Sequence, residues 1–183
     1  MYPIITFVRL REAIDKYQAT LAANSGSGDV ASISWICRNI LELRIWIEFC
    51  GKSAENAIEF YEDAIRDLVD MNKKDSDLDD ATAKVLDRAK STLSRPDKPH
   101  KFRDVKDAAE AVGLKSSSEH RFKLLAKFIH PTAMAIIAPL GKEFTNQMIA
   151  KLVQEYGGIA VEAIKSLESS ELSLAGKSKL NLL

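Results

Sequence analysis

Four charged residues within one apolar stretch are the clearest candidates for chemistry. Residues 34–50 read SWICRNILELRIWIEFC, a segment of helix length without glycine or proline. Arg38 and Glu42 lie four residues apart in it, and Arg44 and Glu48 have the same spacing. Residues at this spacing meet on one side of a helix. Charges are buried in a core only when they are paired with an opposite charge or belong to a functional site. The two Arg–Glu pairs therefore predict either a structural set of ion pairs or the wall of a polar site.

His130 is the candidate for proton transfer, because histidine is the side chain that changes charge near neutral pH. It stands immediately before Pro131, where a helix should break. The cations Arg121, Lys123 and Lys127 precede it. A histidine at such a break can face a cavity and exchange protons, or it can cap a helix end and complete a hydrogen bond in the core. Both interpretations remain open from the sequence.

The elements that must position these residues are helices. Apolar residues recur every three or four positions through most of the chain, and no segment alternates like a strand. We predict an all-α fold, a single helical bundle of six or seven helices over residues 1–167, followed by a polar, fraying tail over residues 168–183. Residues 34–50 form the central helix. In the helix that follows it, Glu62 and Asp63 are expected outside the apolar stripe, and Gly157-Gly158 in the last helix allows a kink or a close helix contact.

Composition excludes several classes of function. Lysine plus arginine and aspartate plus glutamate are both 26 in 183 residues, which argues against a whole-surface role on nucleic acid or an anionic membrane. The longest near-apolar run, residues 133–140, is too short to span a bilayer. Cys37 and Cys50 would lie about 20 Å apart on one helix, too far for a disulfide. They are expected to be reduced core thiols, and the protein to be cytoplasmic.

No metal site or cofactor is predicted. The three histidines are dispersed, without the spacing of a ligand pair. Residues 105–125 resemble a helix-turn-helix, with Ala109 and Gly113 at the usual spacing. Glu119 stands where the second helix of that motif needs an apolar residue, which would leave this helix undocked. DNA binding is therefore a third alternative, behind the two functions below.

Three segments together resemble a family of uncharacterised bacterial all-helical proteins. They are CRNILELRIWIEF with Arg38 and Glu42, KDAAEAVGL, and KFIHP with His130, spread over residues 33–137. The resemblance implies a helical bundle in which the Arg38–Glu42 helix packs near the His130 turn. It implies no particular activity.

This layout is more distantly similar to the HEPN helical domains of prokaryotic defence and toxin systems, many of which cleave RNA without metal. Their mark is an arginine and a histidine on one helix, four to six residues apart. Here Arg121 precedes His130 by nine positions. The ribonuclease interpretation therefore requires Arg38 or Arg44 to supply the guanidinium from another helix, with His130 as acid and base.

Two function classes follow. The first is a non-enzymatic binding or interaction protein, in which Arg38, Glu42, Arg44, Glu48 and His130 form a buried polar network or hold a small anionic ligand. The second is a HEPN-like, metal-independent enzyme acting on RNA, with His130 and Arg38 as its catalytic pair. A homodimer is a further expectation, because Trp35, Trp46 and Phe49 offer a large aromatic contact area unless they lie in the core.

Overall fold

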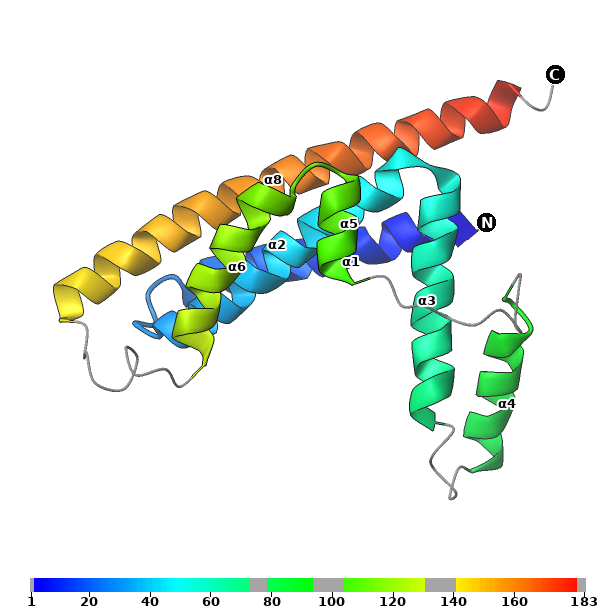
Figure 1. Cartoon of the computed structure of the whole chain (residues 1–183), viewed down its shortest axis with the longest axis horizontal. Helices are drawn as coiled ribbons and strands as arrows, with labels where there is room; N and C mark the ends of the chain where they lie inside the picture. The colour runs from blue at the N-terminus through cyan, green and yellow to red at the C-terminus, as the bar shows by residue number, and fades with distance from the viewer. Residues whose placement is uncertain (1, 73–78, 94–103, 131–140, 181–183) are drawn as a thin grey trace.

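The computed structural model describes residues 2–72, 79–93, 104–130 and 141–180 (Figure 1). These residues form seven helices and no strand, which confirms the all-α class. The helices are α1 (Tyr2–Asn24), α2 (Val30–Lys52), α3 (Ala54–Asn72), α4 (Asp80–Lys90), α5 (Val105–Ala111), α6 (Lys115–Ile129) and α8 (Lys142–Leu180). Among these described helices, none is long and apolar enough to cross a membrane.

The core is built around α2, as its apolar sequence predicts. α2 runs beside α8 in the same direction, and α1 packs on both (Figure 1). At one end of this contact the Cys37 Sγ lies 4.0 Å from the Leu152 carbonyl oxygen. At the other end Gly51 of α2 faces Ser170 of α8. A helix that is apolar on most sides is stable only when several neighbours cover it, and α3, α5 and α6 cover the remaining sides of α2.

α5 and α6 form a compact pair on α2. Gly113 joins them with a φ of 75°, a left-handed conformation that favours glycine. α6 is docked on α2 through the buried Leu125, the partly buried Phe122 and Ile129, and the buried Ser118 near its start. The expectation that this helix would be undocked is therefore wrong, because its apolar contacts begin one turn later than the helix-turn-helix motif requires.

α3 and α4 project from the bundle, as Figure 1 shows. The first turn of α3 is anchored where the Thr6 hydroxyl donates to the Ala57 carbonyl oxygen at 3.0 Å and the Asn56 amide donates to the Phe49 carbonyl oxygen at 2.8 Å. Beyond that anchor α4 packs back on α3. We call residues 61–72 of α3 together with α4 the arm.

α8 is longer than the sequence predicts. It continues to Leu180 rather than ending near residue 167. It also passes through Gly157 and Gly158 as one helix, and a Cβ atom at either position would meet nothing within 4 Å. The close helix contact that these glycines would allow is therefore not made.

Gly158→Ala should stabilise the fold. Alanine in an exposed helix interior is favoured over glycine by about 0.5–1 kcal/mol, and the added methyl group meets no neighbour. We expect the free energy of unfolding, measured by urea denaturation, to rise by about this amount. Gly113→Ala is the matched control and should lower it, because Gly113 has a positive φ. A loss of stability for Gly158→Ala would show that the glycine serves a contact after all.

Candidate functional site

Arg38 and Glu42 pair as their spacing predicts. The Arg38 Nε lies 3.0 Å from the Glu42 Oε1, and the two side chains are 37% and 32% exposed. The Arg38 guanidinium also lies 5.5 Å from the centre of the Phe122 ring on α6, within the range of a cation–π contact. The pair is therefore a partly exposed clamp between α2 and α6, and not a buried charge.

Arg44 does not pair with Glu48, so that prediction is wrong. Its Nη1 lies 2.9 Å from the Glu162 Oε2 on α8. Arg44 follows Cys37 by two helical turns and so faces the side of α2 that packs on α8. The carboxylate that pairs with it on that side is Glu162 of α8, although Glu48 lies one turn further along the same side of α2. The Arg44 Nε is buried and has no hydrogen-bond partner among the described residues.

His130 lies apart from Arg38. It is exposed and follows the last residue of α6, where its backbone N–H donates to the Ala126 carbonyl oxygen at 3.1 Å. It is eight residues beyond Phe122, the α6 residue that contacts Arg38, which corresponds to about 12 Å along the helix. The five candidate residues therefore do not form the single buried network that the sequence predicts.

Two of the cations that precede His130 are engaged elsewhere. The Arg121 Nε lies 2.8 Å from the Glu155 Oε1 on α8, and the Lys123 Nζ lies 2.8 Å from the Glu119 Oε1. An anionic ligand at either cation would have to displace a carboxylate.

The two cysteines are buried and free, as expected. Burial raises the pKa of both thiols to about 12, and the nearby Glu155 and Glu59 charges add to the effect at Cys37 and Cys50 respectively. The thiolate is the nucleophilic form of cysteine, so neither residue is poised for covalent chemistry.

A buried charged cluster on α3 escaped the sequence analysis. The Arg66 Nη2 lies 2.8 Å from the Glu62 Oε2, and its Nη1 lies 3.3 Å from the Asp63 Oδ1. The three side chains are only 14%, 10% and 11% exposed, in the order Arg66, Glu62, Asp63. The expectation that Glu62 and Asp63 lie outside the packed side of this helix is wrong. Their spacing of four and three residues before Arg66 was the available signal.

The arm carries exposed apolar side chains. Leu68 and Met71 on α3 are 44% and 79% exposed, and Val85 on α4 is 62% exposed. Val69 and Leu86, by contrast, are each 7% exposed and lie outside the main core. Because α3 and α4 pack on each other, we expect these two residues to lie between the two helices of the arm.

Helix geometry puts Leu68 and Val85 on the same broad side of the arm. Leu68 comes one residue before the buried Val69, and Val85 comes one residue before the buried Leu86. In two antiparallel helices the sense of rotation is mirrored, so both preceding residues point to the same side. The residues that follow the buried positions are Asp70 and Asp87, and they point to the opposite side. The arm therefore has one apolar side and one charged side, on which Asp87 pairs with Lys90.

The aromatic residues expected at a dimer surface lie mostly in the core. Phe49 is 2% exposed. Trp46 packs against Phe49 and Phe60, with ring centres 6.0 and 4.9 Å apart. Trp35 is exposed and contacts the Tyr17 ring edge-on. These residues do not offer the joint contact area on which the dimer prediction rested.

A shallow hollow lies at the α5–α6 turn, lined by Glu110, Gly113, Lys115, Ser116 and Glu119. The Lys115 Nζ lies 2.7 Å from the Glu110 Oε2, so the cation in this hollow is already paired. Within the part of the chain that the structure describes, no group of three or more histidine, cysteine or acidic side chains is arranged to hold a metal ion.

No protein-family model, curated protein or solved structure matches the chain. The resemblance to bacterial helical proteins and to HEPN domains therefore stays a prediction.

Arg66→Met should destabilise the protein strongly. Removing one partner of a buried ion pair leaves the other charge uncompensated, at a cost of about 3 kcal/mol. The loss should appear as a lower free energy of unfolding in urea. Lys123→Met is the matched control, because Lys123 is 71% exposed in its pair, and it should change stability by less than about 0.5 kcal/mol. Equal small effects for both variants would show that the Arg66 cluster contributes little.

Proposed function

We propose that this chain is a non-enzymatic helical interaction protein that binds a partner protein through the apolar side of its arm. The observation that carries the proposal is the exposure of Leu68, Met71 and Val85 on two helices that project from the bundle (Figure 1).

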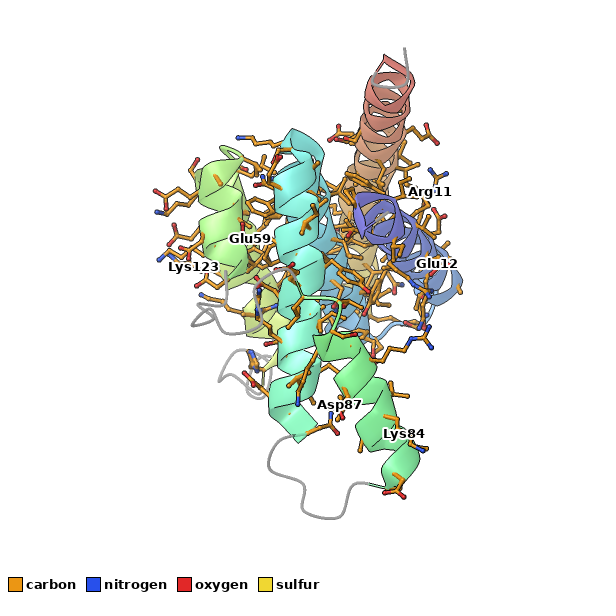
Figure 2. All side chains as sticks on the ribbon, turned by 90° about the vertical axis from the view of Figure 1, so that its right-hand side faces the viewer. Arg11, Glu12, Glu59, Lys84, Asp87 and Lys123 are labelled. Carbon is orange, nitrogen blue, oxygen red and sulfur yellow. The ribbon has the colours of Figure 1, made fainter. Side chains whose placement is uncertain are left out.

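Exposed apolar groups on a projecting element favour protein binding. Apolar residues scattered singly on a surface need no explanation, but contiguous ones rimmed by polar residues mark interaction sites. Leu68 and Met71 lie one turn apart on one helix, and Val85 shares the side of Leu68. Charged residues border them, with Asp67 on α3 and with Lys84 and Arg88 on α4. Figure 2 shows Lys84 on α4, far from the α1–α2–α8 core.

The polar candidates favour a structural role over a site for a small anion. Arg38 is paired with Glu42 and Arg44 with Glu162. An anionic ligand at either guanidinium would have to displace the carboxylate that already pairs with it, so binding would gain little free energy. The Arg44–Glu162 pair instead connects α2 to α8. The Arg38–Glu42 pair lies at the contact between α2 and α6, where Arg38 also meets Phe122.

The interaction role is tested by comparing two leucines of similar exposure. Leu68 on the arm is 44% exposed, and Leu124 on α6 is 41% exposed. Tagged wild-type protein, Leu68→Asp and Leu124→Asp would be expressed in the source cells, and the co-purified proteins quantified by mass spectrometry. We expect Leu68→Asp to lose specific partners by at least about tenfold, because it places a charge in an apolar contact. Leu124→Asp should retain them.

An unchanged set of partners for Leu68→Asp would contradict this role of the arm. Both variants must first show the wild-type helical circular dichroism, so that unfolding is not mistaken for lost binding.

RNA cleavage is a second candidate, favoured by one observation. His130 is exposed at the end of α6, the helix that also contacts the partly exposed Arg38. His130 would act as acid and base at the cleaved phosphate, and Arg38, about 12 Å away along α6, would bind another phosphate of the same RNA strand.

His130→Ala should lower any metal-independent RNA cleavage at least about 100-fold, because the proton-transfer group is lost. His120→Ala is the matched control, since His120 is also exposed on α6. Purified protein would be assayed with EDTA on single-stranded and folded RNA. Equal cleavage by both variants, or none by the wild type, would remove this candidate.

A further inference from the structure

We infer that the partner bound by the arm is a second copy of this chain, so that two arms pack face to face as a four-helix bundle with α3 of one copy lying over α4 of the other. This inference rests on the proposed function and names its partner.

The apolar side of one arm is suited to another arm. A two-helix hairpin with one open apolar side is marginal alone, and a second hairpin covers that side completely. Leu68 and Val85 lie near the middle of this side, with Met71 at its edge. Pairing two identical surfaces requires each surface to be complementary to itself under a two-fold rotation.

Charges on the edges of the arm meet this requirement. Asp67 lies two residues before Val69, which places it on the outer edge of α3. Lys84 and Arg88 lie two residues before and after Leu86, which places them on the outer edge of α4. None of these three side chains forms an ion pair with another described residue of its own chain. One edge of the arm is therefore acidic and the other basic.

The edge charges select one of two symmetric arrangements. A two-fold axis across the helices would stack α3 on α3 and bring Asp67 near Asp67 of the second copy, while the α4 cations met one another. An axis along the helices places α3 over α4 of the second copy, with neighbouring helices antiparallel. Asp67 then meets Lys84 and Arg88 of the second copy, and the same contact occurs twice. Like charges across an interface are unfavourable and opposite charges fix its register, so the second arrangement is selected.

The test uses charge reversal and mixing. Wild-type protein, Asp67→Arg and Lys84→Glu/Arg88→Glu would be measured by analytical ultracentrifugation over a concentration series. We expect a wild-type dimer whose dissociation constant rises at least about tenfold in either variant, because each reversal creates two like-charge contacts. An equimolar mixture of the two variants should regain the wild-type dimer. Each variant would need the wild-type circular dichroism.

A wild-type monomer at all concentrations, or no recovery in the mixture, would overturn the inference. If the wild type is monomeric while Leu68→Asp still loses its cellular partners, the arm binds another protein and the proposed function stands. If the wild type is monomeric and those partners are unchanged, both proposals fall. Leu124→Asp, off the arm, should dimerise like the wild type, and a lost dimer there would place the interface on α6 and likewise overturn the inference.

Discussion

The parallel packing of α2 against α8 is the constraint on which the rest of the structure depends. α2 is apolar on nearly every side, so it must be covered on nearly every side. α8 and α1 cover two sides, and α5, α6 and the first turns of α3 cover the others. Among the described helices, these pack around α2, and α4 packs on α3. The arm keeps an exposed apolar side because the other described helices pack around α2.

The charges on α2 follow from the same packing. Arg44 faces α8 because it lies two turns after Cys37, and it therefore takes Glu162 as its partner. Arg38 faces α6 and rests on Phe122. Partly exposed ion pairs of this kind contribute about 1 kcal/mol or less each, so they adjust the packing more than they drive it. The more deeply buried charges are those of Glu62, Asp63 and Arg66, in the first turns of the arm.

Sequence reasoning recovered what local patterns determine. The helical class, the central position of α2, the Arg38–Glu42 pair and the buried thiols all follow from periodicity, composition and spacing within one helix. The partner of Arg44 could not be found in this way, because Glu162 comes from a helix more than 100 positions away. Likewise, the burial of Glu62 and Asp63 depends on tertiary packing that periodicity does not reveal. The distance of His130 from Arg38 depends on the direction in which α6 crosses α2.

The candidate site lies elsewhere than the residue types suggested, because tertiary packing decides which groups are left exposed. Residue types pointed to arginine, glutamate and histidine, whereas packing leaves an apolar side of the arm exposed. The account is tested most directly by measuring amide hydrogen exchange at low and high protein concentration. The account predicts that protection rises with concentration in residues 61–71 and 80–90 while residues 115–129 stay unchanged. Exchange in the arm that is independent of concentration, or protection that rises in α6 instead, would contradict self-association through the arm.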